Sequence, residues 1–153
     1  MLAVQEKPSI KKSLYEEDLY AWAQNSVNLL KNKNFAALDI PHLIEEIEDM
    51  GRSERRAIES HLRNVLMHLL KWQFQPQMRS KSWELSLFNS RTEISDIILE
   101  SPSLAYRVEE NMALEYQRAV KAASLETGLS TKTFPNASPY LQAQVLDMDW
   151  LPE

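Results

Sequence analysis

The chain has 153 residues, of which 17 are basic and 22 acidic, so its formal net charge is −5 in an otherwise ordinary globular composition. The absence of cysteine excludes disulfides, thiolate metal sites and cysteine nucleophiles. Only two glycines are present, which favours long helices over sheets joined by tight turns. We predict a flexible N-terminal tail over residues 1–14 and a single helical domain over residues 15–153.

The first helix is predicted to start at Ser13. In Ser13-Leu-Tyr-Glu16 the serine and the glutamate have the capping-box spacing, in which each side chain accepts a hydrogen bond from the other residue's backbone N–H. Apolar residues then recur at helical spacing, which predicts a buried stripe formed by Leu19, Trp22, Leu29 and Leu30. The polar residues 32–34 are expected to end this helix.

A single long helix is predicted over about residues 40–75. Asp39 is a suitable N-cap, Pro41 is tolerated in the first turn, and Pro76 ends the helix. One apolar phase continues across Gly51, which favours one helix over two; it comprises Ile44, Ile47, Gly51, Arg55, Ile58, Leu62, Val65 and Leu69. Such a helix is about 54 Å long, whereas a compact domain of this size has a radius of gyration of about 15 Å. It is therefore expected either to bend near Gly51 or to project and contact a partner chain.

The rest of the chain predicts three further helices. One covers about residues 82–100, and the next follows Ser101-Pro102 to about residue 126, with Gly128 as the left-handed residue after its end. A short helix then starts at Ser138-Pro139, and the closing Trp-Leu-Pro segment is expected to dock on the bundle. The fold class is thus all-α, a helical bundle of four main helices plus a short C-terminal helix.

Several stretches together resemble one family, the domain of unknown function 29 family of cyanobacteria and other bacteria. They are YEEDLYAWAQ, the long-helix segment LIEEIEDMGRSERRAIESHLRNVLMHLLKWQFQP, then RSKSW, SPSL and ETGL, and the closing FP, SPY and LPE. The resemblance covers about residues 15–153 and implies a helical bundle. It supplies no catalytic residues, because the family has no agreed activity. Ser138 stands where many relatives have a cysteine, so a thiol there has no general role.

His61 and His68 lie seven residues apart on one side of the long helix, about 10.5 Å along its axis. A zinc-binding pair on a helix needs a spacing of four, so neither a metal site nor a cofactor is predicted. His68 is either a hydrogen-bonded residue at the edge of the core or a general acid or base. In the second interpretation Lys71 lies beside it on the helix surface, and Glu46 is the carboxylate that orients it.

Arg55 and Arg91 fall in the apolar phase of their helices, where an unpaired charge is costly. Each is expected to reach solvent or to form a structural ion pair, while a pocket shared with His68 would instead bind an anion. The carboxylates considered for the ion pairs are Glu17, Glu45 and Glu46. The acidic residues of 45–49 are interpreted as a solvated helix face rather than as Mg²⁺ ligands.

Charge is unevenly distributed along the chain. Residues 51–91 carry a balance of +5, whereas residues 15–50 and 92–153 each carry −6. A basic middle between acidic flanks is either a binding surface for an anion or is neutralised when the helices pack.

Two functions are predicted from these features, beside a purely structural role. The first is an interaction module that presents the basic 51–91 segment to a protein or nucleic-acid partner; its binding residues are Arg52, Arg55, Arg56, Trp83 and Arg91. The alternative is an enzyme acting on an anionic substrate such as nucleic acid, with His68, Lys71 and Arg91 in the site.

A projecting long helix predicts a homo-oligomer, with an interface that includes residues 51–66. No apolar run reaches the roughly 18 residues that a membrane span needs, and the N-terminus lacks the apolar core of a signal peptide. We therefore expect a cytoplasmic protein with no membrane contact.

Overall fold

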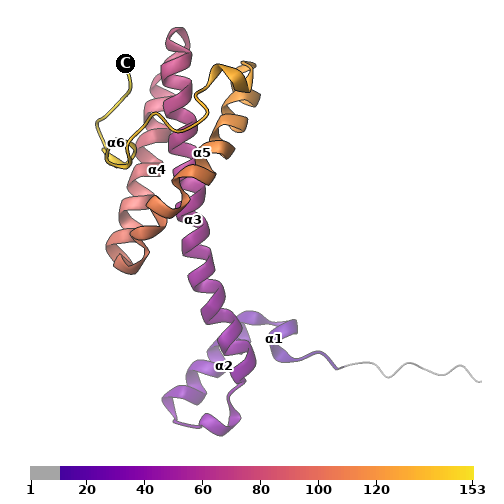
Figure 1. Ribbon diagram of the computed structural model, residues 1–153. Coiled ribbons are helices and arrows are strands. Elements are labelled where there is room, and N and C mark those ends of the chain that lie inside the picture. The colour runs from indigo at the N-terminus through magenta and orange to yellow at the C-terminus, as the bar shows by residue number, and fades with distance from the viewer. Residues whose placement is uncertain (1–10) are drawn as a thin grey trace, which may run out of the picture. The chain divides into compact units, whose positions relative to one another are not determined.

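The computed structural model describes residues 11–153, which are helical and loop-connected without any strand (Figure 1). The α-helices are α1 (Leu14–Glu17), α2 (Leu19–Lys31), α3 (Ile40–Phe74), α4 (Lys81–Glu100), α5 (Tyr106–Thr127) and α6 (Gln142–Leu146). Four of them are long and α6 is short, so the predicted all-α class is confirmed. No helix within the described residues is both long enough and apolar enough to cross a membrane.

The chain divides into two compact units, Met1–Asp49 and Met50–Glu153, here called unit 1 and unit 2. Helix α3 contributes its first residues to unit 1 and the rest to unit 2. The single domain expected over residues 15–153 stays a prediction. Of the tail expected over residues 1–14, residues 1–10 lie outside the described part of the chain.

Unit 1 starts with the predicted capping box. The Ser13 side chain accepts from the Glu16 N–H, and the Glu16 carboxylate accepts from the Ser13 N–H at 2.9 Å. The prediction of one helix from Ser13 onward is wrong, because Asp18 adopts extended dihedrals (φ −151°, ψ 91°) and caps α2 through the N–H of Ala21. Aspartate favours such local caps over helix interiors, and it therefore separates α1 from α2.

The interior of unit 1 is aromatic and polar. The Tyr15 ring stacks on His42 with centroids 3.9 Å apart and meets Trp22 edge-on at 5.0 Å. Asp39 Oδ2 lies 2.6 Å from His42 Nδ1 and accepts from Trp22 Nε1 at 3.2 Å. The stripe predicted on α2 is only partly buried, since Trp22 is covered but Leu19 and Leu30 are not.

Helix α3 runs without interruption through Gly51, as predicted. The exposure of its apolar side chains, however, changes along the helix. From Ile58 to Leu70 the large apolar residues are buried, including Leu62, Val65 and Leu69, whereas Ile44 and Ile47 are exposed. The shared phase thus predicted one helix correctly but not one buried stripe.

The core of unit 2 forms where α3 packs with α4, α5 and the C-terminal segment. Ser80 caps α4, and Gly128 (φ 75°) ends α5 in the left-handed conformation that was predicted. Trp150 packs edge-on against Tyr140 with centroids 5.8 Å apart, so the expected docking of the chain end is confirmed. Each fully buried leucine of this core contributes about 2 kcal/mol of hydrophobic free energy.

Candidate functional site

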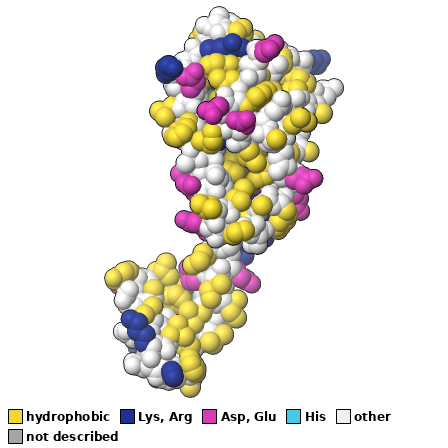
Figure 2. Space-filling view, turned by 90° about the vertical axis from the view of Figure 1, so that its left-hand side faces the viewer, with side chains coloured by type: hydrophobic (Ala, Val, Ile, Leu, Met, Phe, Trp, Pro, Cys, Tyr) yellow, Lys and Arg dark blue, Asp and Glu magenta, His cyan; other side chains and the backbone are white. Residues whose placement is uncertain are grey.

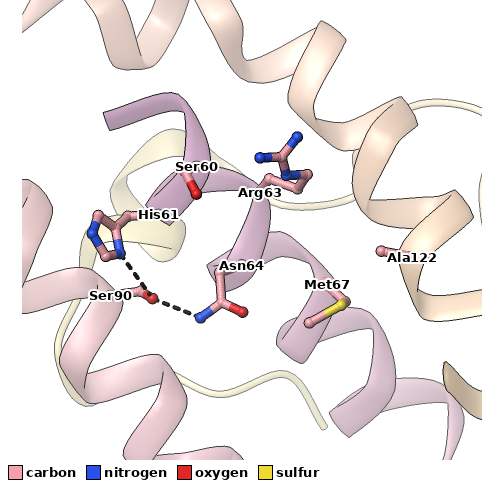
Figure 3. Close-up of a pocket in the computed structure, with 7 residues that line it drawn as sticks. All are labelled: Ser60, His61, Arg63, Asn64, Met67, Ser90 and Ala122. Atoms are coloured by element: carbon pink, nitrogen blue, oxygen red, sulfur yellow. Dashed lines mark hydrogen bonds between the residues drawn. The ribbon is translucent and has the colours of Figure 1, made fainter. Parts of the chain in front are cut away.

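A pocket lies on α3 in unit 2, between side chains of α4 and α5 (Figure 3). It has a volume of about 300 Å³. Its lining residues are Ser60, His61, Arg63, Asn64, Met67, Ser90 and Ala122. Five of these follow one another on successive turns of α3, so the helix supplies the floor of the pocket.

Ser90 joins the two polar side chains of α3 that it faces (Figure 3). The Asn64 side-chain amide donates to Ser90 Oγ at 2.6 Å, and Ser90 Oγ lies 3.3 Å from His61 Nδ1. The Ser90 hydroxyl therefore bridges the side chains of His61 and Asn64. Ser90 itself is buried, so this hydroxyl orients its neighbours rather than presenting a nucleophile.

The second polar cluster surrounds Lys71, whose side chain is also buried. Lys71 Nζ donates to Glu126 Oε2 at 2.5 Å and lies 4.6 Å from the centroid of the Trp83 ring. The structure therefore brings together Lys71 and Trp83, which the sequence had placed in different roles. A carboxylate and an aromatic face together stabilise an ammonium group that is removed from water.

His68 lies one turn before Lys71 and is buried as well. Its Nδ1 donates to the backbone carbonyl of Asn64 at 2.9 Å. Burial lowers the pKa of His68 below its ordinary value and Lys71 lowers it further, against the opposing effects of the Asn64 carbonyl and Glu126. The imidazole is therefore neutral at neutral pH.

Arg91 anchors the C-terminal segment. Its Nε donates to the carbonyl of Val145 at 2.8 Å and its Nη2 to the carbonyl of Gln144 at 3.1 Å, at the end of α6. Burial lowers the pKa of Arg91, and Asp147 and Asp149 oppose this effect. The prediction of a carboxylate partner for Arg91 is wrong, because backbone carbonyls accept hydrogen bonds from this buried guanidinium. The carboxylates expected were Glu17, Glu45 and Glu46.

Glu46, the predicted orienting carboxylate, belongs to unit 1. Its Oε1 accepts from the Tyr15 hydroxyl at 2.6 Å, and this hydrogen bond is the main cause that raises the pKa of Tyr15 to about 12. His68, Lys71 and Trp83 lie in unit 2. The structure thus gives Glu46 a partner of its own within unit 1.

Basic side chains continue along α3 from the pocket toward the N-terminus of unit 2. Arg52, Arg56, Ser60 and Arg63 fall on one face of the helix, which we call the arginine face. Arg55, next to it, and Arg56 are exposed, and neither makes a hydrogen bond or an ion pair within residues 11–153. Arg52 is half-buried and has contacts of its own.

A buried carboxylate lies beside the arginine face. Glu115 of α5 is fully buried, and its Oε1 accepts from Arg118 at 2.6 Å. Its Oε2 lies 3.8 Å from Arg63 Nη1 and has no hydrogen-bond partner in the described part of the chain. One carboxylate thus fixes two guanidinium groups that remain partly exposed, which leaves a local excess of positive charge.

The residues of these clusters that were not predicted include Asn64, Ser90, Glu115 and Glu126. Two of them had a signal in the sequence. Asn64 lies one turn from both histidines, and Glu115 falls within the apolar phase of its helix, where a carboxylate requires a partner. Ser90 and Glu126 reach α3 from other helices, so only the packing reveals them. No group of three or more His, Asp or Glu residues in the described chain could hold a metal ion.

The fold and the site define an all-α protein whose longest helix carries polar side chains that contact α4 and α5. The family profile described as "Domain of unknown function DUF29" matches residues 14–151, so the chain belongs to this family. No curated protein matches the sequence. No solved structure matches it either.

Proposed function

We propose that the chain is an interaction module that binds an acidic segment of a partner protein on the arginine face of α3. The observation that carries this proposal is the state of Arg56 on this face and of Arg55 next to it, since both are exposed and unpaired within residues 11–153. Most other bases of residues 51–91 already have partners, among them Lys71, Arg91 and Lys81. The pocket beside Arg63 adds the donors of Ser60 and His61 for a polar side chain of the ligand.

A protein partner is favoured over nucleic acid by the small number of available bases. Nucleic-acid binders typically neutralise several phosphates at once, and their affinity depends on that number. The unpaired arginines here are few, and the whole chain carries a charge of −5. A short acidic segment matches a patch of this size. A bacterial cytoplasmic location is part of the proposal, and the cysteine-free sequence fits a reducing compartment.

The enzyme alternative has one observation in its favour. The lowered pKa of His68 keeps its imidazole neutral, which is the form that acts as a general base. Against it, His68 Nδ1, Lys71 and Arg91 each have an internal partner. These contacts support a structural role for all three residues, and a binding function for the surface around them.

Fluorescence anisotropy with a labelled glutamate-rich peptide tests the proposal. The probe is titrated with the full chain and with the Arg52→Ala/Arg55→Ala/Arg56→Ala variant at low and at physiological salt. Each exposed ion pair contributes about 0.2–1 kcal/mol, so the triple change is expected to weaken binding about tenfold. The difference is expected to shrink as the salt concentration rises.

A matched control removes three positive charges elsewhere in unit 2, in Lys81→Ala/Lys121→Ala/Lys132→Ala. This variant is expected to bind the peptide nearly as well as the unmodified chain. Equal losses in the two variants would mean that only net charge matters, and the arginine face would have no special role. Tighter binding of a single-stranded oligonucleotide of equal charge would contradict the choice of a protein partner.

A further inference from the structure

Unit 1 exposes an unusual amount of apolar surface. Nine large hydrophobic side chains between Leu14 and Ile47 are 40–75% exposed. In the space-filling view most side chains on the visible face of this unit are hydrophobic (Figure 2). Ile40, Ile44 and Ile47 stand out, because their spacing places all three on one face of α3; we call them the isoleucine stripe.

The same unit has almost no apolar core. Trp22 and Ser26 are the only buried residues among residues 11–49. Folded segments of about 40 residues or fewer usually need a disulfide, a metal or a partner chain, because they bury too little surface. The chain has no cysteine, and the described residues form no metal cluster, so neither a disulfide nor a metal site supplies the missing stability.

We propose that a second copy of this chain covers the isoleucine stripe, in an antiparallel two-fold pair of the N-terminal parts of α3. A stripe with i, i+4 and i+7 spacing is self-complementary, because two such helices bury the same residues against each other. A two-fold contact uses one patch on both copies and therefore closes at a dimer. Symmetric dimers are also the commonest assembly of soluble proteins.

The exposed area of unit 1 is sufficient for such a contact. A stable interface needs about 800 Å² from each partner. The three isoleucines supply part of this area, and the six other exposed large side chains of unit 1 bring the total to that order.

This interface differs from the one that the sequence predicted over residues 51–66. The apolar residues of that segment, Ile58, Leu62 and Leu66, are fully buried inside unit 2. They are therefore already used within one chain, whereas the isoleucine stripe is not.

Sedimentation equilibrium of the full chain at micromolar concentration measures the assembly. The expected mass is twice the 17.8 kDa of one chain. Ile44→Glu/Ile47→Glu places like charges at the centre of the contact and is expected to give the monomer mass. Leu99→Glu/Leu125→Glu, at exposed positions of unit 2, is the matched control and is expected to remain dimeric. A single 17.8 kDa species of the unmodified chain overturns the proposal.

Cysteine cross-linking gives a second readout that does not depend on a disruptive variant. Because the chain has no cysteine, Ile44→Cys introduces a unique thiol at the centre of the stripe. Near a two-fold axis this residue faces its own copy, so mild oxidation is expected to yield a disulfide-linked dimer, whereas Leu99→Cys is not. Equal cross-linking of both variants overturns the proposed contact. A monomer that still binds the glutamate-rich peptide overturns the dimer and leaves the proposed function intact.

Discussion

Unit 1 and unit 2 hold their helices together by different kinds of contact. Unit 2 has a contiguous apolar core in which Leu62, Leu66 and Leu69 are completely buried. Unit 1 relies on hydrogen bonds and ring contacts around Tyr15 and His42, while its isoleucines face outward. Hydrogen bonds among part-exposed groups each contribute only about 1 kcal/mol, whereas apolar burial is the dominant favourable term in folding. The contacts within unit 2 therefore account for its stability, whereas those within unit 1 do not.

The largest expected effect is a loss of unfolding free energy, and it differs between substitutions in the two parts of α3. Leu69→Ala leaves a cavity in the core of unit 2 and is expected to cost about 2–5 kcal/mol of unfolding free energy. This loss should not depend on protein concentration. Ile44→Ala is expected to cost less at low concentration and more as the concentration rises, because its contacts form between chains. Urea unfolding over a dilution series measures both.

Equal concentration dependence of the two variants would remove the distinction between the units. The distinction would also be contradicted if Ile44→Ala destabilised the protein as much as Leu69→Ala at every concentration. Leu125→Ala, at an exposed position of α5, serves as the control and is expected to change stability by less than about 0.5 kcal/mol.

An intermediate effect is expected from the ion pair between Lys71 and Glu126, whose two partners differ in exposure. Lys71 is buried, whereas the Glu126 side chain is about half exposed. Glu126→Gln removes the charge that compensates a buried ammonium and is expected to cost about 1–3 kcal/mol. Lys71→Met leaves the carboxylate near water and puts an apolar chain of similar length on Trp83, so it is expected to cost clearly less. Thermal unfolding of both variants at neutral pH tests this order, and the reverse order would contradict the assigned burial cost.

Helical periodicity and capping residues were sufficient to predict most of the fold. Ser13, Pro76 and Gly128 mark helix ends through local backbone chemistry, which is fully contained in neighbouring residues. Asp18 was missed because the capping box at Ser13 and the apolar stripe from Leu19 were interpreted as parts of one helix, whereas Asp18 starts a second one. Helical periodicity also does not predict whether an apolar stripe is buried, since Ile47 and Ile58 lie in one phase but Ile47 is exposed and Ile58 is buried.

The candidate site was predictable only where one helix supplies it. His61 and His68 were selected from their spacing as a polar ridge along α3, with Lys71 beside His68, and the structure gives each of the three a polar contact. The partners Ser90 and Glu126 lie tens of residues away in sequence, so their positions depend on how α4 and α5 pack. The role of Arg91 was not predictable for the same reason, because the carbonyls that accept its hydrogen bonds lie at the end of α6, far away in sequence.

The smallest expected effect concerns His68 and its dependence on pH. Since burial lowers the pKa of His68 in the folded chain, the unfolded chain takes up a proton below about pH 6.5 that the folded chain does not. The contribution of neutral His68 to the free energy of unfolding is therefore fully present above about pH 6.5. It decreases as the pH falls toward the pKa of His68 in the folded chain. His68→Gln removes this dependence, at a cost of about 1 kcal/mol near neutral pH.

Urea unfolding between about pH 7.5 and 5.5 tests the assignment, because histidine is the residue type whose ordinary pKa lies in this range and variants that differ in one histidine isolate its contribution. The unmodified chain and His61→Gln are expected to lose stability toward the acidic end, and His68→Gln to lose less. His61→Gln is the matched control, since it lies on the same ridge two turns away and bonds Ser90 instead of its own helix. If His68→Gln keeps both its stability and the acid sensitivity of the unmodified chain, the imidazole is not the buried neutral group described. A stable His68→Gln protein that no longer binds the glutamate-rich peptide, beside a His61→Gln protein that does, would instead give His68 a direct role in function.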